Sequence, residues 1–266
     1  MQNPIQHNIQ LYSCAGEAET EHDPFVYEHS LSFITSGSAE IFTSEGVISY
    51  PTGTLSLIGR NQLLKVTKKP DGENSFASVT VFLDQETLKK YSLQHNVRTD
   101  GTYIGKRNIL LVVDPFLKGF FDSMMPYFAQ PEKFTPILQQ VKTTEAIELL
   151  LRNPALKNFL FDFSEPYKID LESYMNRHFS YNVPISQFAK LTGRSLSTFK
   201  RDFVKTYGIT PQKWLQKQRL EKAFFLLSEK NWRPSDVYLE AGFENLSHFS
   251  FAFKKQFGYS PTQLLK

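Results

Sequence analysis

The chain has 266 residues, of which 41% are hydrophobic and 21% are charged, and its formal net charge is +3. This mixture is typical of a globular protein with a sizeable core, and the length suits two domains better than one. The single cysteine, Cys14, excludes an intrachain disulfide framework and a thiolate metal cluster, and we interpret it as an inert thiol.

Targeting signals are not recognisable at the start of the sequence. The first ten residues have neither the basic start nor the apolar run of a signal peptide. The longest strongly apolar runs, 109–113 and 149–151, are far shorter than the ~20 residues of a membrane-spanning helix. We therefore expect a soluble, cytoplasmic protein without a membrane partner.

Short alternating apolar and polar runs occupy residues 5–83, and glycine, proline and serine separate them. The runs predict strands over 30–35, 39–43, 47–50, 54–58, 63–67 and 76–82, with a later strand within 103–113. Strands this short and evenly spaced predict an antiparallel sandwich or small barrel. Such a barrel either holds a small ligand or is filled by its own side chains.

Helical periodicity follows, with a short helix over 84–91 and longer ones over 115–128 and 136–152. In the last of these, mostly three- and four-residue steps separate Ile137, Val141, Thr144, Ala146, Ile147, Leu150 and Leu151. We expect the barrel to bury one apolar stripe and a partner chain, most simply a second copy, to bury another. A further apolar segment over 155–163 precedes a hinge at 164–169, which is the predicted domain boundary.

The C-terminal region contains one pattern twice, at a spacing of 50 residues. Such a period indicates a duplicated supersecondary unit. After a helix over 170–178, two helix-turn-helix-like motifs are predicted at about 184–207 and 234–257, joined by a long helix over 212–227. The matched positions include Pro184 and Pro234, Phe199 and Phe249, Phe203 and Phe253, Gly208 and Gly258, and Pro211 and Pro261.

Charge separates the two parts of the chain. Residues 170–266 hold 15 Lys and Arg against 8 Asp and Glu, whereas the preceding residues hold 15 against 19. In the second helix of the first motif, Leu196, Phe199, Phe203 and Tyr207 form the expected inner stripe. The opposite face presents Ser197, Lys200, Arg201 and Val204. An apolar inner stripe with a basic outer face is what a helix in the DNA major groove requires.

The runs LTGRSLSTFKRDFVKTYGITPQKWLQKQRLEKAFFLL and AGFENLSHFSFAFKKQFGYSPTQLL resemble the AraC/XylS family of bacterial transcription regulators. The resemblance is specific over the C-terminal third, and the N-terminal part agrees only in architecture. It implies an α+β protein with a cupin-like regulatory and dimerisation domain over 1–163, a linker over 164–169 and a DNA-binding domain over 170–266. Double-stranded DNA, a homodimer partner and RNA polymerase are the implied partners, and transcription activation is the implied outcome.

Carried over by position, the resemblance assigns two groups of DNA-contacting residues. The base-facing positions are Ser197, Lys200 and Arg201 in the first motif and Ser247, Ser250 and Phe251 in the second; the phosphate-contacting positions are Arg194, Thr198, Lys205, His248, Lys254 and Lys255. The second motif departs from the family at Phe251, where a basic residue is usual. Either Phe251 contacts a thymine methyl, or this motif binds mainly through the DNA backbone and shape, which we favour.

Other functions have weaker support in the sequence. His22, Glu28 and His29 lack the close His-x-His grouping of cupin enzymes, so no metal or other cofactor is predicted. The sequence also lacks a Ser-His-Asp order and a phosphate-binding glycine loop, which favours a protein that is not an enzyme. The alternative is a cupin-type enzyme or sugar-handling barrel fused to a DNA-binding tail. The effector, small molecule or protein, stays open.

Overall fold

A computed structural model describes residues 9–14, 18–20, 24–43, 46–72, 75–164 and 168–264. Apart from residues 23–25, the chain divides between residues 164 and 165 into two compact units, the N-terminal unit and the C-terminal unit. His22, the side chain of Cys14, hinge residues 165–167 and the last two residues lie outside the described part. Within it, no helix combines the length and apolarity needed to cross a bilayer.

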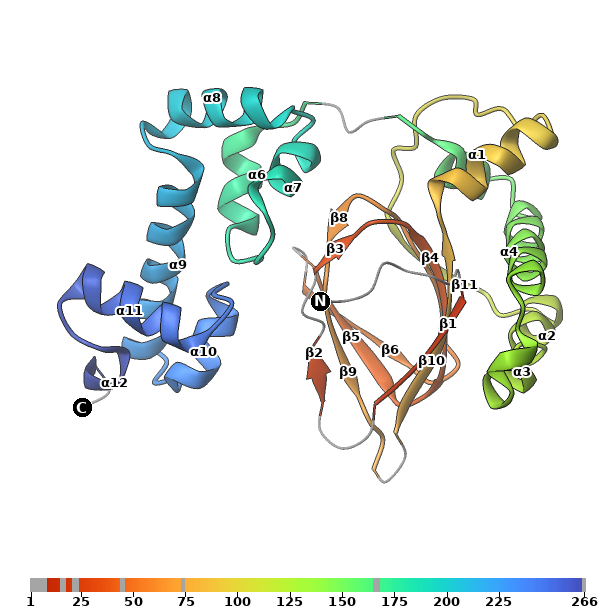
Figure 1. The fold of residues 1–266 in the computed structure, drawn as a ribbon, viewed down its shortest axis with the longest axis horizontal. Coiled ribbons are helices and arrows are strands. Elements are labelled where there is room, and N and C mark those ends of the chain that lie inside the picture. The colour runs from red at the N-terminus through yellow and green to blue at the C-terminus, as the bar shows by residue number, and fades with distance from the viewer. Residues whose placement is uncertain are drawn as a thin grey trace. The chain divides into compact units, whose positions relative to one another are not determined.

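Antiparallel strands build the N-terminal unit (Figure 1). Its larger sheet has the order β1 (Ile9–Cys14), β10 (Phe76–Leu83), β4 (His29–Ser36), β7 (Leu55–Ile58) and β11 (Asn108–Leu111). A second sheet has the order β2 (Glu19–Thr20), β9 (Lys65–Lys69), β5 (Ser38–Thr43) and β6 (Gly46–Pro51), and β3 (Phe25–Val26) pairs with β8 (Gln62–Leu63). The predicted β-rich domain is confirmed, although the described strands form separate sheets and not one closed barrel.

Side chains alternate between the two faces of the larger sheet, and both faces are buried. Leu31 and Phe33 of β4 lie opposite Val81 and Val79 of β10, and these four belong to a core shared with the helices. Ile34 and Phe76 belong instead to a second core, with Ile41 and Tyr50 of the smaller sheet. The larger sheet is therefore the middle layer of the unit.

The helices of the N-terminal unit cover the outer face of this sheet (Figure 1). They are α1 (Gln85–Gln94), α2 (Pro115–Asp122), α3 (Met125–Ala129), η1 (Pro131–Lys133), α4 (Pro136–Leu151) and α5 (Leu156–Phe161). Helix α4 buries Ala146, Ile147 and Leu150, whereas Ile137 and Val141 are 74% and 55% exposed. One apolar stripe of α4 is thus used within the unit and the other faces solvent.

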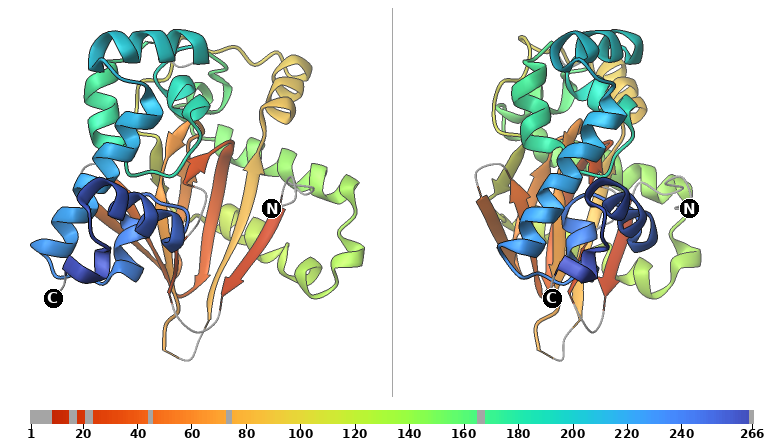
Figure 2. Two further views of the ribbon diagram at one scale, coloured as in Figure 1. Left: turned by 60° about the vertical axis from the view of Figure 1, so that its left-hand side comes forward. Right: turned by 90° about the vertical axis from the view of Figure 1, so that its left-hand side faces the viewer.

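The C-terminal unit is entirely helical where it is described (Figures 1 and 2). Its helices are α6 (Leu171–His178), α7 (Ile185–Leu191), α8 (Leu196–Tyr207), α9 (Pro211–Ser228), α10 (Pro234–Glu240), α11 (Leu246–Phe257) and α12 (Pro261–Leu264). Helices α7 and α8 form the first motif, α10 and α11 form the second, and α9 joins them. The two-domain α+β architecture expected from the sequence is confirmed.

The duplicated aromatic residues form the two cores of this unit. Phe199 and Phe203 in α8, and their counterparts Phe249 and Phe253 in α11, are all 0% exposed. The inner stripe is shorter than predicted, because Leu196 is 42% exposed. It is the first residue of α8, and the helix enters the core only from its second turn. In α9, Leu220 is buried, whereas Gln218 is half-buried and its amide donates a hydrogen bond to Glu221 at 3.0 Å.

Candidate nucleic-acid interface

Helix α8 is held in place at both ends and along its inner face. The hydroxyl of Ser195 accepts a hydrogen bond from the Thr198 N–H at 3.3 Å, and Gly208 ends the helix with a φ of +70°. Between these ends, the Phe203 ring lies 5.5 Å from that of Trp214 in α9. The packing fixes which side of α8 faces outward.

The outward face of α8 carries the residues predicted to contact bases. Ser197, Lys200, Arg201 and Val204 are all exposed, and they follow one another over two turns of the helix. The Arg201 side chain is 77% exposed, and its guanidinium lies 3.7 Å from the Asp202 carboxylate. The face is therefore polar, basic and long enough to contact several successive base pairs in a groove that admits one helix.

The second motif has the same frame and a different outer face. Asn245 caps α11 by accepting a hydrogen bond from the His248 N–H at 2.8 Å, and Gly258 ends the helix with a φ of +88°. Ser247 is exposed, Ser250 is half-buried, and Phe251 is 70% exposed. An apolar ring thus stands where the first motif has Arg201.

The residues predicted to contact phosphates fall into two groups. Lys205, Lys254 and Lys255 are exposed in the last turns of α8 and α11, and His248 is exposed in the first turn of α11. Thr198 is half-buried, and its hydroxyl accepts a hydrogen bond from the Ser195 hydroxyl at 2.9 Å.

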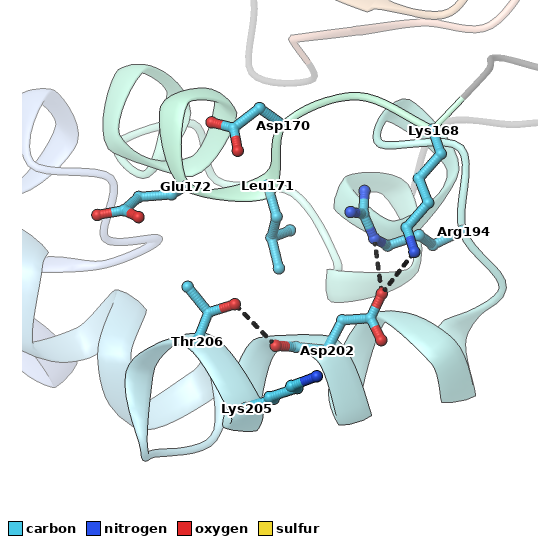
Figure 3. Close-up of a pocket in the computed structure, with 8 residues that line it drawn as sticks. All are labelled: Lys168, Asp170, Leu171, Glu172, Arg194, Asp202, Lys205 and Thr206. Carbon is cyan, nitrogen blue, oxygen red and sulfur yellow. Dashed lines mark hydrogen bonds and ion pairs between the residues drawn. The ribbon is translucent and has the colours of Figure 1, made fainter.

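Arg194 occupies a different environment from the other predicted phosphate contacts. Its side chain is only 7% exposed. The guanidinium donates to the carbonyls of Ile169 and Thr192, at 2.9 and 2.7 Å. It also donates to the Asp202 carboxylate at 3.2 Å (Figure 3). These bonds give Arg194 a structural role, whereas its contact with a DNA phosphate stays a prediction.

Asp202 is the centre of this ion cluster. Lys168, within the predicted hinge, approaches the same carboxylate at 3.2 Å, and the hydrogen bonds from Arg194 and Lys168 hold the pKa of Asp202 below its ordinary value. No sequence pattern indicates the cluster, because Lys168 and Asp202 are far apart along the chain. The cluster borders an open pocket of about 490 Å³ between α6 and α8, lined by Lys168, Asp170, Leu171, Glu172, Arg194, Asp202, Lys205 and Thr206 (Figure 3).

The candidate metal ligands of the N-terminal unit have structural partners. Glu28 accepts a hydrogen bond from the Gln85 N–H at 3.2 Å, at the start of α1. His29 is 3% exposed, and its Nδ1 accepts a hydrogen bond from the Arg60 N–H at 3.3 Å. Among the described residues, no three His, Cys, Asp or Glu side chains are grouped so that they could hold a metal ion.

Family models match both parts of the chain. A model described as the ExsA N-terminal regulatory domain matches residues 29–161, which is half of the chain, and a helix-turn-helix domain model matches residues 188–266.

Individual relatives agree with these matches. The chain is 23% identical to the HTH-type transcriptional regulator ExsA of Pseudomonas aeruginosa, over 96% of this chain and 92% of ExsA. It is 26% identical to the virulence regulon transcriptional activator VirF of Yersinia enterocolitica, over 65% of this chain and 64% of VirF. Among solved structures, ToxT of Vibrio cholerae with a bound unsaturated fatty acid aligns over 100% of this chain and 96% of that chain, with 12% identity and a TM-score of 0.42.

The C-terminal unit thus has two helix-turn-helix motifs joined by one helix, with a basic outer face on α8. The N-terminal unit of the same chain matches a regulatory domain model. The relatives ExsA and VirF are named as transcription regulators, and the match to ExsA extends over 96% of this chain. The chain belongs to the AraC/XylS family of DNA-binding transcription regulators.

Proposed function

We propose that this regulator activates transcription by placing both motifs on one DNA duplex, with α8 as the base-contacting helix and α11 mainly as a backbone-contacting helix. The observation that carries the proposal is the exposed face of Ser197, Lys200 and Arg201, opposite the fully buried Phe199 and Phe203. Burial of the aromatic stripe leaves α8 one orientation, in which the basic face points to solvent.

Sequence recognition is assigned to Lys200 and Arg201. Both side chains donate hydrogen bonds, and guanine presents the O6 and N7 acceptors in the major groove. A good pair of this kind discriminates against the wrong base by about 1–3 kcal/mol. The Ser197 hydroxyl, one turn earlier, adds a contact that can donate or accept.

Affinity is assigned to the exposed cations Lys205, Lys254 and Lys255, with Thr198 and His248 beside them. Contacts of this type neutralise phosphates and release counterions, so they weaken steeply with salt and carry little sequence information. The second motif fits this role, because its outer face has Ser247, the half-buried Ser250 and the apolar Phe251.

The N-terminal unit is proposed to receive the signal and to form a homodimer through the exposed stripe of α4. Ile34, Ile41, Tyr50 and Phe76 pack between its two larger sheets, which favours a protein partner over a small effector. RNA polymerase is the proposed target of activation, and the cytoplasm is the proposed compartment because the DNA is there. No observation favours the alternative, in which the N-terminal unit is an enzyme, over a regulatory role of this unit.

The central test removes the basic face of α8. Duplexes that the wild-type protein selects from a random library serve as the probe. We expect K200A/R201A to bind them about a hundredfold more weakly, with lost base preference at the first motif's site. The control K213A/K217A removes two exposed lysines from α9 and leaves the net charge of the two proteins equal. Equal affinity and unchanged base preference in K200A/R201A would show that α8 is not the base-contacting helix.

A second measurement concerns Phe251. Because its side chain is 70% exposed, F251A should leave thermal stability unchanged. If the second motif binds through backbone and shape, the bases selected from the library by F251A match those selected by the wild type. A new preference at a thymine position in the second site would instead show that Phe251 contacts a thymine methyl.

A further inference from the structure

Helix α9 passes through the cores of both motifs. Near its start, the Trp214 ring packs on Phe203 and Tyr207 of the first motif, with ring centroids 5.5 and 4.8 Å apart. Near its end, Leu220, Ala223 and Leu227 share a core with Phe249 and Phe253 of the second motif. Arg219 lies between these two sets of contacts, at the junction of the motifs.

Arg219 binds the backbone that follows α6. Its Nε donates to the Phe179 carbonyl at 2.9 Å, and its Nη2 donates to the Tyr181 carbonyl at 2.8 Å. The Phe179 ring in turn packs edge-on against Trp214 at 6.3 Å, so this loop belongs to the core of the first motif. Burial lowers the pKa of Arg219 to about 10, which agrees with a guanidinium withdrawn from water.

The same loop touches the turn of the second motif at Gly242. A Cβ on Gly242 would clash with the Ser180 carbonyl oxygen and lie 2.9 Å from its carbon, closer than real Cβ atoms approach, and it would make a tight contact of 3.0 Å with Arg219 Nε. Gly242 also has a φ of +91°, which L side chains rarely adopt. The loop backbone therefore lies directly on the turn between α10 and α11, at a distance that only glycine permits.

Residues 179–181, Arg219 and Gly242 are named here the inter-motif bridge. We propose that this bridge, and not α9 alone, fixes the distance and orientation between α8 and α11, which makes Arg219 and Gly242 positioning residues for the recognition of two sites at one spacing. A single connecting helix can still bend between its two motifs, whereas a second attachment restricts that bending. For DNA recognition the inference rests on the proposed function, because both motifs must bind one duplex.

The geometric test needs no DNA. Cys14 is replaced by serine, and spin labels are attached through T206C and Q256C, which are exposed and equivalent positions of α8 and α11. We expect a narrow label-to-label distance distribution in the otherwise wild-type protein by double electron–electron resonance. R219M keeps an unbranched side chain and loses both hydrogen bonds, and G242A separates the loop from the turn; both should broaden or shift the distribution.

Gly258 supplies a matched control for G242A. Its φ of +88° is nearly that of Gly242, but a Cβ there meets nothing within 4 Å. G258A thus imposes the same backbone strain without the clash, and its distance distribution should stay narrow. If G242A fails to fold by circular dichroism, R219M and G258A still decide the question. An unchanged distribution in R219M overturns the proposal, as does equal broadening in R219M and G258A.

The DNA measurement separates the two proposals. From a duplex library, the wild type and G258A should select two sites at a single spacing, and R219M should select the same first site with relaxed spacing. The affinity of R219M for the duplex selected by the wild-type protein should fall about tenfold or more, since the effective concentration of the second motif at its site decreases. If R219M changes the label-to-label distance but the wild type binds no DNA specifically, the inter-motif bridge is supported and the proposed function is overturned. Unchanged spacing preference in R219M would contradict the bridge alone.

Discussion

At the residue scale, His29 shows how burial lowers the pKa of a titratable side chain. Its ring is 3% exposed, packs 4.8 Å from the Phe159 ring, and has an Nε2 atom without a hydrogen-bond partner. Burial, and secondarily the nearby charges of Arg60 and Arg107, lowers the pKa of His29 to about 3. The ring is therefore neutral in the folded protein, with Nδ1 as the acceptor for the Arg60 N–H.

This lowered pKa predicts a pH dependence of stability. The unfolded chain takes up a proton at His29 below about pH 6.5 and the folded protein does not, so stability is complete above that pH and decreases as the pH falls. Between pH 6.5 and 5 the loss amounts to about 2 kcal/mol. Urea titrations at pH 7 and pH 5 should show a smaller loss for H29Q than for the wild type. H95Q changes an exposed histidine and should keep the wild-type dependence; equal losses in H29Q and the wild type would refute the assignment.

At the element scale, the ion cluster around Arg194 joins three segments. The guanidinium links the Ile169 carbonyl at the end of the predicted hinge, the Thr192 carbonyl in the turn and the Asp202 carboxylate on α8. The second motif has Glu244 and Ala252 at the equivalent positions, so it lacks this pair. Among the described residues, this ion cluster thus ties the first motif to the backbone at Ile169.

We predict that R194M destabilises the C-terminal unit by about 2–3 kcal/mol, because the Ile169 carbonyl and the Asp202 carboxylate lose the guanidinium that donates to them. R201M, on the exposed side of the same helix, should change stability by less than about 0.5 kcal/mol. Urea unfolding followed by tryptophan fluorescence suits the measurement, since Trp214 and Trp232 both lie in this unit. If R194M instead kept full stability and reduced only the salt dependence of DNA binding, Arg194 would be a phosphate contact after all.

At the scale of the whole molecule, the exposed stripe of α4 bears on assembly. We predict that the wild type sediments as a dimer and that I137E/V141E shifts it to monomer, raising the dissociation constant about a hundredfold or more through lost apolar burial. Folding should be unaffected, because both side chains are exposed in the single chain. L93E, at an 84% exposed position of α1, is the control. A dimer that tolerates I137E/V141E, or a wild type that is monomeric throughout, would exclude this stripe as the interface.

Local pattern determined much of the fold and part of the candidate site. Turn residues and alternation predicted the strands of the N-terminal unit, and the 50-residue repeat predicted both motifs. Helical spacing predicted that Lys200 and Arg201 face away from Phe199 and Phe203, because one helix presents positions four apart on the same side. The exposure of these residues agrees with that expectation.

Only the tertiary structure decided which basic side chains are exposed to solvent, and which contacts besides α9 connect the two motifs. Arg194 and Arg201 look alike in the sequence. In the structure, the Arg194 side chain is buried and bonded to carbonyls and Asp202, whereas Arg201 faces solvent. Arg219 and Gly242 show no sign in the sequence of their contact with residues 179–181, because those partners lie far away along the chain. The sequence by itself determined the elements and their inner faces, which depend on the spacing of neighbouring residues. The partners of buried charges and the placement of one motif against the other depend on distant segments, and folding alone brings those together.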